Sequence, residues 1–266
     1  MTDLAAKTVL VTGATDGLGR GIAHALAEGQ ATVLVHGRDA ARAEALAVEL
    51  RAAGATARVY VADLASLAEV RALANHVLDQ EPRLDVLVNN AGIGSTVPSA
   101  ERGESRDGVE LRFAVNYLSH YLLTRKLLPL LRSCPPSRVV NVSSAGQAAI
   151  DFKDPMLTHG YSGARAYCQS KLAQILFTFD LADELAGTGV TVNALHPATF
   201  MPTKIVATPL SSLDEGVQAT MRLITDPALA GITSKYFNGV HEATADAQAY
   251  DLADRGRLRT LSDELT

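Results

Sequence analysis

The sequence predicts a single α/β domain over residues 1–266, in which helices cover both faces of one parallel β-sheet. Short runs rich in β-branched residues alternate with longer Ala- and Leu-rich segments of helical period, a pattern typical of consecutive β-α-β units. Each short run is apolar throughout, as expected of a strand covered on both faces. Right-handed crossovers between such strands give a three-layer α/β/α, doubly wound sheet.

The predicted elements follow one another along the chain with short connections. The strands are expected at 8–12, 32–36, 57–61, 84–89, 138–142, 190–195 and, as a short closing strand, 235–237. The helices are expected at 18–28, 40–53, 67–80, 108–132, 163–186 and 216–224. Asp39 and Ser66 precede the second and third helices and are predicted to be their N-caps.

Two irregular stretches interrupt this alternation, at 145–160 and at 198–214. Long loops inside compact domains often cover or line a binding site. We therefore expect a substrate lid over about residues 198–230; the alternative is a solvated excursion of the chain.

Composition excludes several classes of protein. The chain is 47% hydrophobic and 20% charged, so burial can offset the entropy lost on ordering, unlike in a disordered chain. A net charge of −5 offers no basic field for nucleic acid. The two cysteines have no metal-ligand spacing, and no apolar run reaches the roughly 18 residues of a membrane span. We expect a cytoplasmic protein with a small-molecule partner, no bound metal and no membrane association.

A glycine-rich loop, TGATDGLG at 12–19, stands between the first strand and the first helix. Glycines there allow a sharp turn and let a pyrophosphate approach backbone N–H groups at a helix N-terminus. This context favours a Rossmann-type dinucleotide site over a plain tight turn. The predicted cofactor contacts in the loop are Gly13, Thr15, Asp16, Gly17, Leu18 and Gly19.

The end of the second strand bears on the choice of dinucleotide. An acid is expected there for a free ribose 2′-hydroxyl, but the sequence reads His36, Gly37, Arg38. An arginine suits a 2′-phosphate, so NADP is favoured. NAD stays open because Asp39 and Asp16 lie close in the sequence.

The third strand is followed by two further predicted cofactor contacts, Asp63 and Leu64. Asp63 is placed to meet the adenine edge. Capping of the following helix is its alternative role.

Tyr167 and Lys171 stand four residues apart on a predicted helix, so their side chains share one face. A tyrosine with a pKa of about 10 is a poor base at neutral pH, and a neighbouring ammonium together with an oxidised nicotinamide favours its phenolate. NNAG at 89–92 and the pair Ser143 and Ser144 end two other strands, where they face the same crevice.

With Asn116 in FAVNYLS, this ordered set resembles the short-chain dehydrogenase/reductase family over nearly the whole chain. The resemblance implies that Tyr167 exchanges a proton with the substrate oxygen and that Lys171 lowers the pKa of Tyr167 and binds the nicotinamide ribose. It also implies that Ser144, the second of its pair, bonds the substrate oxygen and that Asn116 anchors a water leading to Lys171. A structural role for Asn116, bonding local backbone, is the alternative.

The resemblance also implies nicotinamide contacts beyond this set. They are Asn90, Ala91, Gly92, Tyr167, Lys171, Pro197 and Thr199. Thr203 is an alternative to Thr199 for the carboxamide. Ala198 stands where the family commonly has glycine, and a positive φ there would strain an alanine.

A closer likeness, in the segment at 166–185 and in the long insertion between Ser144 and Tyr167, is to the retinol-dehydrogenase-like branch, which implies tolerance for apolar substrates. A homodimer or homotetramer assembled through the two long helices is implied by the resemblance alone. We expect an NADP-preferring oxidoreductase that moves hydride between the cofactor and a carbonyl or secondary alcohol. A non-catalytic NAD(P)-sensing protein on the same fold is the alternative, because fold alone does not fix function.

Overall fold

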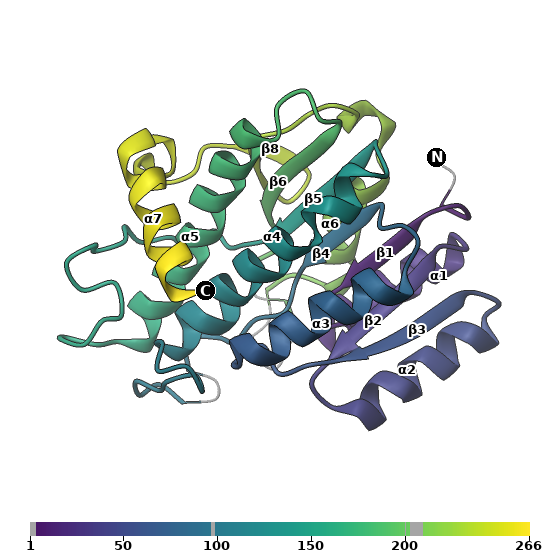
Figure 1. The fold of residues 1–266 in the computed structure, drawn as a ribbon, viewed down its shortest axis with the longest axis horizontal. Helices are drawn as coiled ribbons and strands as arrows, with labels where there is room; N and C mark the ends of the chain where they lie inside the picture. Colours follow the sequence, from purple (N-terminus) through teal and green to yellow (C-terminus); the bar gives the residue numbers. More distant parts are fainter. Residues whose placement is uncertain (1–3, 97–98, 200, 203–209) are drawn as a thin grey trace.

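The computed structural model describes residues 4–96, 99–199, 201–202 and 210–266, and in these it contains an eight-stranded sheet of order β3-β2-β1-β4-β5-β6-β7-β8 (Figure 1). All neighbouring strands from β3 to β7 pair in parallel, and β8 pairs antiparallel to β7. The predicted doubly wound sheet is confirmed. The strands are β1 (Thr8–Val11), β2 (Thr32–Gly37), β3 (Thr56–Val61), β4 (Val86–Asn89), β5 (Ser137–Val142), β6 (Val190–His196), β7 (Lys235–Asn238) and β8 (His241–Ala243).

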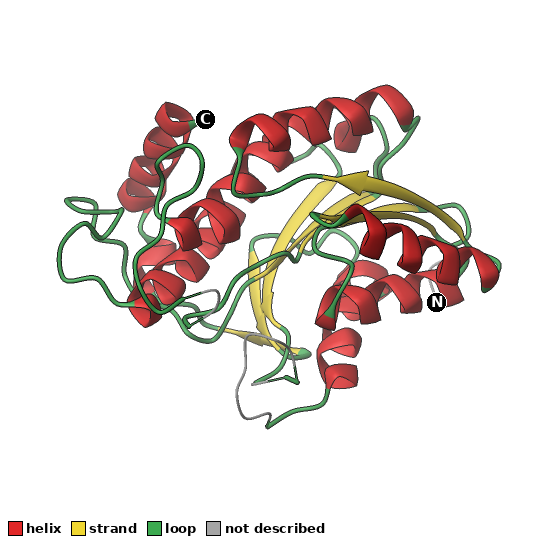
Figure 2. Cartoon of the chain, turned by 90° about the horizontal axis from the view of Figure 1, so that it is seen from below, coloured by secondary structure: helices red, strands yellow, loops and turns green. Residues whose placement is uncertain are grey.

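Helices lie on both sides of the twisted sheet, giving the three predicted layers (Figure 2). One layer holds α1 (Gly17–Glu28), α2 (Ala40–Ala52) and α6 (Leu213–Thr225). The other holds α3 (Leu67–Gln80), α4 (Ser119–Arg132) and α5 (Gly163–Glu184), with α7 (Leu252–Leu265) packed on α5. Asp39 and Ser66 cap α2 and α3 as predicted, since each side chain accepts a backbone N–H of the first turn.

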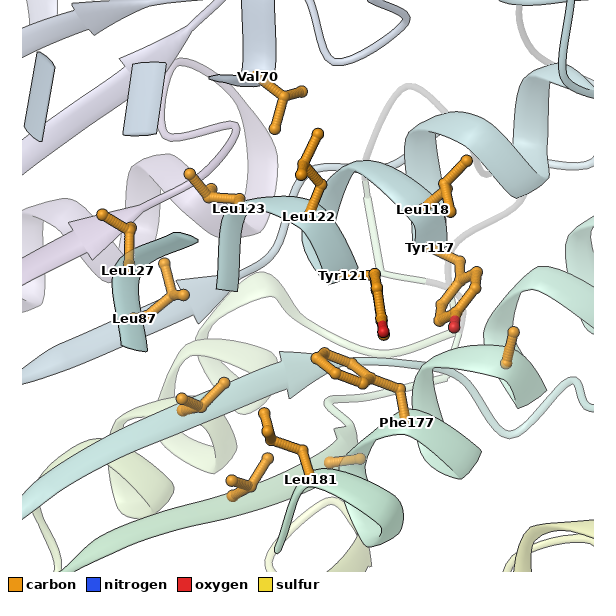
Figure 3. Close-up of a cluster of buried hydrophobic side chains, with 14 of the residues drawn as sticks. Val70, Leu87, Tyr117, Leu118, Tyr121, Leu122, Leu123, Leu127, Phe177 and Leu181 are labelled. Atoms are coloured by element: carbon orange, nitrogen blue, oxygen red, sulfur yellow. The ribbon is translucent and has the colours of Figure 1, made fainter. Parts of the chain in front are cut away.

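Two buried clusters fill the space between these layers, and the strand period of two divides the residues between them. In β1, Leu10 packs toward α3, α4 and α5, whereas Val9 and Val11 pack toward α1 and α2. Figure 3 shows the first cluster, in which the Phe177 ring of α5 lies 5.0 Å from that of Tyr121. Burial on both faces therefore fixes which side chains of each strand face each helix layer.

The predicted helix at 108–132 is wrong at its start. Gly108 has a φ of +76° and lies in a turn closed by its N–H to Ser105 O. A π-helical segment, η1 (Phe113–Leu118), then leads into α4. Such segments are rare and often mark functional sites, and here the segment carries Asn116.

Four elements at the C-terminal end are absent from the predicted set: the strand β8, the helix α7 and two short 3-10 helices, η2 (Pro227–Leu229) and η3 (Ala247–Tyr250). The β8 strand is three polar or small residues long, too short for a period to appear. Helix α7 contains Gly256, and only its Leu258 and Ser262 are buried. The stability of α7 depends on contacts with other segments, and such contacts leave no periodic pattern of apolar residues in the sequence.

Helix α7 lies over the two helices through which the family resemblance implies assembly. Tyr117 OH lies 2.6 Å from Ser262 Oγ, and Arg259 pairs with Asp180 of α5 at 2.7 Å. The predicted homodimer or homotetramer stays a prediction, and assembly through this face of α5 would have to accommodate α7.

The predicted lid falls in two parts. Residues 200 and 203–209, including Thr203, lie outside the described residues. Further along, α6 packs on α1, and its Ala219, Leu223 and Ile224 belong to a core cluster. The covering role therefore stays a prediction for the segment before α6. Among the described residues, no helix combines the length and the apolar character that a membrane span needs.

Candidate active site

The glycine loop brings β1 and β4 into close contact at the carboxyl edge of the sheet. Gly13 has a φ of +64°, and a Cβ there would stand 2.9 Å from the Ala91 Cα. A Cβ on Gly19 would stand 2.2 Å from Gly13 O. Both positions exclude a side chain because neighbouring backbone fills the space, so the loop turns tightly into the N-terminus of α1.

His36 fixes the glycine loop against the neighbouring strands. Gly13 N donates to His36 Nδ1 at 3.1 Å, so the ring proton sits on Nε2 and is donated to Ala62 O at 3.2 Å. Burial lowers the pKa of His36 to about 4, which keeps the imidazole neutral and able to accept. Sequence reasoning noted His36 only as standing where an acid is missing.

Thr12 anchors the NNAG segment after β4. Its Oγ1 accepts from the backbone N–H of Asn90 at 2.9 Å and of Ala91 at 3.0 Å. Asn90 Nδ2 in turn donates to Thr12 O at 2.8 Å. The predicted contacts Asn90, Ala91 and Gly92 therefore lie directly beside the glycine loop.

Asp16 and Asp39, the two acids that kept NAD as an alternative cofactor, both have partners within the protein. Asp16 caps α1 through Gly17 N and pairs with Arg42 at 2.9 Å. Asp39 accepts from Arg42 N at 3.1 Å. Arg38 is exposed at the end of β2, and no hydrogen bond or ion pair of its guanidinium occurs among the described residues. Its charge is therefore available to an anion.

Thr15 and Gly37 explain why a glycine follows His36. A Cβ on Gly37 would lie 2.6 Å from Thr15 Cγ2, so the loop packs directly on the end of β2. Arg42 also donates to Thr15 O at 3.0 Å. Arg42 is thus a second guanidinium at this loop, and sequence reasoning missed it because its only signal is its place in the first turn of α2.

Asp63 does not cap the next helix, since Ser66 does. Its Oδ1 accepts from Ala65 N at 3.0 Å, within the loop that follows β3. Leu64 is buried at 5% exposure, and Leu18 of the glycine loop is buried at 6%. The adenine contact of Asp63 stays a prediction.

Tyr167, Lys171 and Ser144 meet where β5 ends beside α5. Lys171 Nζ lies 5.9 Å from the centroid of the Tyr167 ring, so the two side chains share a helix face as their spacing predicts. Burial raises the pKa of Tyr167, and a hydrogen bond with the Ser144 side chain acts in the opposite direction. Of the two serines after β5, Ser144 is therefore the one whose hydroxyl bonds the Tyr167 side chain.

The two serines after β5 have different partners. Ser143 Oγ donates to Lys171 O at 2.7 Å and is committed to the backbone of α5. Ser144 Oγ accepts from Gly146 N at 3.0 Å, while its carbonyl accepts from Tyr236 OH at 3.0 Å. Tyr236, on β7, therefore positions Ser144 from a strand distant in sequence.

Lys171 is buried, and its Nζ donates to Val142 O at 2.9 Å and to Gln174 Oε1 at 3.0 Å. Burial lowers its pKa to about 7. Neutral acceptors thus support the ammonium.

Asn116 ties three segments together. Its Oδ1 accepts from Ile93 N at 2.8 Å, and its Nδ2 donates to Ile93 O and to Ser170 Oγ. Its backbone carbonyl lies 3.0 Å from His120 Nδ1. The side chain therefore joins the loop after NNAG to α5, and the predicted water beside Asn116 stays a prediction.

The segment after β6 accommodates Ala198 at the position where the family commonly has glycine. Ala198 is not among the residues of positive φ, so the alanine there is unstrained. Thr199 Oγ1 lies 3.1 Å from His196 Nε2, and Pro197 is buried. His196 is 8% exposed at the strand end, and burial lowers its pKa.

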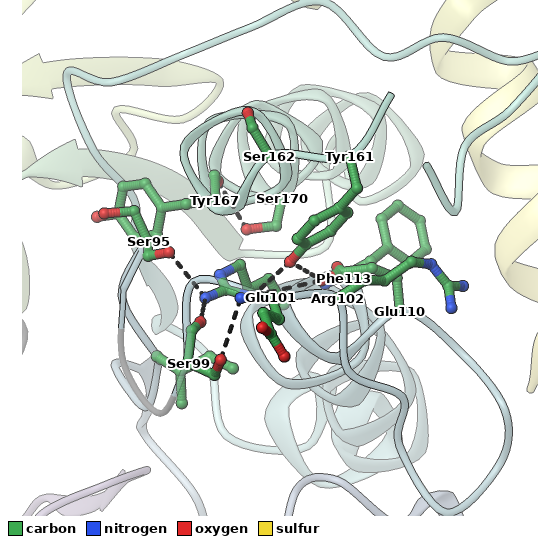
Figure 4. Close-up of polar contacts among 12 residues, drawn as sticks. Ser95, Ser99, Glu101, Arg102, Glu110, Phe113, Tyr161, Ser162, Tyr167 and Ser170 are labelled. Atoms are coloured by element: carbon green, nitrogen blue, oxygen red, sulfur yellow. Dashed lines mark hydrogen bonds and ion pairs between the residues drawn. The ribbon is translucent and has the colours of Figure 1, made fainter. Parts of the chain in front are cut away.

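Arg112 is a buried arginine that sequence reasoning did not single out. Its guanidinium donates to Gly94 O, Ser95 O and Ser99 O and to Tyr161 OH. Three of these partners, Ser95, Ser99 and Tyr161, are labelled in Figure 4. Glu110, also buried, lies 3.8 Å away. This cluster fixes the loop after NNAG against the start of α5, where a Cβ on Gly163 would stand 2.1 Å from Ser95 O. No periodic signal marks a buried arginine in a sequence.

The residues described suit a nicotinamide dinucleotide. The glycine loop packs tightly at Gly13 and Gly19 and leads into the N-terminus of α1, whose free N–H groups and dipole would stabilise the pyrophosphate charge. A Cβ on Gly92 would lie 3.2 Å from Asn116 Oδ1 and 3.6 Å from Lys171 Nζ, so the NNAG segment lies directly beside both predicted catalytic side chains. The fit extends from the glycine loop to Tyr167.

Comparisons with known proteins agree with this site. The family model described as short chain dehydrogenase matches residues 7–212. Mouse retinol dehydrogenase 14 is 39% identical over 287 residues, covering 97% of this chain and 85% of that protein.

Two solved structures are similar over most of the chain. One, of an uncharacterized protein from Mycobacterium paratuberculosis, has a TM-score of 0.84 at 32% identity and covers 100% of this chain and 95% of that one. The other, the RhlG/NADP active-site complex of Pseudomonas aeruginosa, has a TM-score of 0.72 at 29% identity, covering 90% of this chain and 97% of that one.

Proposed function

We propose that this chain, which belongs to the short chain dehydrogenase family in its retinol-dehydrogenase-like branch, prefers NADP and uses Tyr167 as its acid and base. As a member of that family it is an NAD(P)-dependent oxidoreductase of alcohol and carbonyl groups. The observation that carries the proposal is the meeting of Tyr167, Ser144 and Lys171 at the end of β5. The proposed substrate is an apolar carbonyl compound or alcohol.

The cofactor would supply the hydride in reduction and accept it in oxidation, and the chain's own residues orient the substrate and transfer the proton. In reduction, Ser144 Oγ–H donates a hydrogen bond to the carbonyl oxygen and Tyr167 OH gives that oxygen its proton. In oxidation, the Tyr167 phenolate accepts the hydroxyl proton. The Lys171 ammonium, one turn away on α5, stabilises the phenolate by its charge.

NADP preference rests on charge at the end of β2. Asp16 and Asp39 are engaged by Arg42, whereas the Arg38 guanidinium is exposed beside the expected ribose position. A planar guanidinium forms paired, charge-assisted hydrogen bonds with a phosphate. The RhlG complex, which holds NADP, lends support by likeness.

The apolar substrate is supported by the relatives, since retinol dehydrogenases are named for an apolar alcohol. The substrate class is tested by a panel of aldehydes, ketones and alcohols of graded chain length, each with NADPH or NADH, followed by the absorbance of the reduced nicotinamide. We expect turnover with NADPH that improves as the substrate becomes more apolar. Tight NADPH binding without turnover of any substrate would instead favour the non-catalytic sensor.

A further inference from the structure

Lys171 is joined to a buried amide that the proposed mechanism does not use. Gln174 is 1% exposed and lies on the next turn of α5, with its Oε1 3.0 Å from Lys171 Nζ. Val142 O is the other acceptor of that Nζ. A buried cation with only neutral acceptors depends strongly on each of them, because an unpaired charge in a protein interior is costly.

The other end of the amide faces a buried imidazole. Gln174 Nε2 lies 3.4 Å from His120 Nδ1, and His120 is 1% exposed on α4. The same Nδ1 lies 3.0 Å from Asn116 O, one turn earlier, in the π-helical segment. On its far side, His120 Nε2 lies 3.2 Å from Thr12 Oγ1, the hydroxyl that holds Asn90 and Ala91.

A neutral imidazole has one N–H, and its position decides which neighbour is served. A proton on Nδ1 is donated to Asn116 O, and Nε2 then accepts from the Thr12 hydroxyl. A proton on Nε2 is donated to Thr12, and Nδ1 then accepts from the Gln174 amide. The amide that holds Lys171 therefore responds to the tautomer of His120.

We propose that Gln174 and His120 are positioning residues of the reaction: Gln174 holds the Lys171 ammonium beside Tyr167, and His120, with its proton on Nε2, holds the Gln174 amide and links it to Thr12. This inference rests on the proposed function of Tyr167. It adds a connection between Lys171 and Thr12 of the glycine loop that is built from two side chains, Gln174 on α5 and His120 on α4.

The charged and titratable groups around Lys171 come from several elements. Tyr167 faces it from α5, His120 from α4 and His196 from the end of β6. Burial and the Lys171 charge lower the pKa of His120 to about 3, so His120 stays neutral wherever the enzyme is assayed. A change in the pH profile near neutrality therefore reports on Lys171 and Tyr167.

The test is the pH dependence of alcohol oxidation in Gln174→Leu. Loss of an acceptor disfavours the ammonium, which weakens its support of the Tyr167 phenolate. The midpoint of the rise in kcat/KM should move to higher pH by about one unit, and the rate below the midpoint should fall about tenfold. Gln174→Asn, whose shorter amide does not reach Nζ, should show the same shift and serves where the leucine variant does not fold.

The matched control is Gln169→Leu, a glutamine of the same helix that is also 1% exposed but donates to Pro155 O. It should lose stability and keep the wild-type midpoint. His120→Leu should shift the midpoint in the same direction as Gln174→Leu, and the double variant should shift it no further, because the two side chains act in series.

An unchanged midpoint in both Gln174 variants, or an equal shift in Gln169→Leu, would overturn the inference. The proposed function fails differently, since it requires Tyr167→Phe to lose turnover. Loss of turnover in Tyr167→Phe with an unmoved midpoint in Gln174→Leu would leave the proposed function standing and remove this inference alone.

Discussion

Lys171 Nζ lies 5.9 Å from the centroid of the Tyr167 ring, one helical turn along α5. Burial acts on the two groups in opposite senses, raising the pKa of the tyrosine and lowering that of the lysine to about 7. Both effects favour the neutral forms, because a low-dielectric interior penalises either charge alone. Each charge of the pair that alcohol oxidation needs therefore depends on the other for stabilisation.

The NADP preference is tested at Arg38. Arg38→Ala should weaken NADPH binding about 10- to 100-fold, the loss expected for hydrogen bonds to a charged group, and change NADH binding little. Dissociation constants for both cofactors are measured by fluorescence titration. The control is Arg20→Ala on α1, which removes an exposed ion pair with Glu49 of α2. It should leave the ratio of the two dissociation constants unchanged. Equal losses for both cofactors in Arg38→Ala would refute the assignment.

Two glycines in helices should respond oppositely to alanine. Gly19→Ala places a Cβ 2.2 Å from Gly13 O, so cofactor affinity and stability should both fall. Gly256→Ala in α7 meets nothing within 4 Å and should raise the free energy of unfolding by about 0.5–1 kcal/mol, the usual gain in a helix interior. Urea denaturation measures the stability of both variants, and fluorescence titration measures the cofactor affinity of Gly19→Ala. A destabilised Gly256→Ala would contradict the described packing of α7.

Stability should fall with acid before the carboxylates titrate. His36 and His120 have folded pKa values of about 4 and about 3, below the unfolded value of 6.5. The unfolded chain therefore binds more protons as pH falls below 6.5, and by pH 5 each group should cost about 2 kcal/mol. Urea midpoints measured between neutral pH and pH 5 test this.

A variant at His36 separates that effect from general acid denaturation. His36→Phe should be less stable at neutral pH, because Gly13 N and Ala62 O lose their partner, and should show a shallower fall with acid. The exposed His241→Gln should keep the wild-type slope. Equal slopes in His36→Phe and the wild type would show that His36 is not the acid-sensitive group.

Arg112 should be a strong determinant of stability. Arg112→Met leaves buried Glu110 without its cation and three loop carbonyls without a donor, which should cost about 3–5 kcal/mol. Arg257→Met, at an exposed pair with Asp254, should stay within about 1 kcal/mol of the wild type. A mild effect of Arg112→Met on the denaturation midpoint would show that its buried bonds contribute little.

The sheet and the reactive helix were predictable because their signals are local. Buried parallel strands such as β5 are continuous apolar runs, and a spacing of four places Tyr167 and Lys171 on one face of α5. The partners of these residues were not predictable in the same way. Tyr236 reaches Ser144 from β7 and His120 reaches Gln174 from α4, and contacts between distant segments have no sequence period. For the same reason α7 was missed, while the predicted helix at 108–132 began too early because Gly108 occupies a turn.

Tyr167 is proposed to carry the proton of the reaction, and the Tyr167→Phe variant isolates that role. The phenylalanine keeps the ring and removes only the hydroxyl, so the affinity for NADPH, measured by titration, should stay close to that of the wild type. Turnover of a substrate found in the panel should fall by about 100- to 10,000-fold, the factor that general acid and base catalysis typically supplies. NADPH binding of wild-type strength together with near wild-type turnover in Tyr167→Phe would show that Tyr167 does not carry the proton.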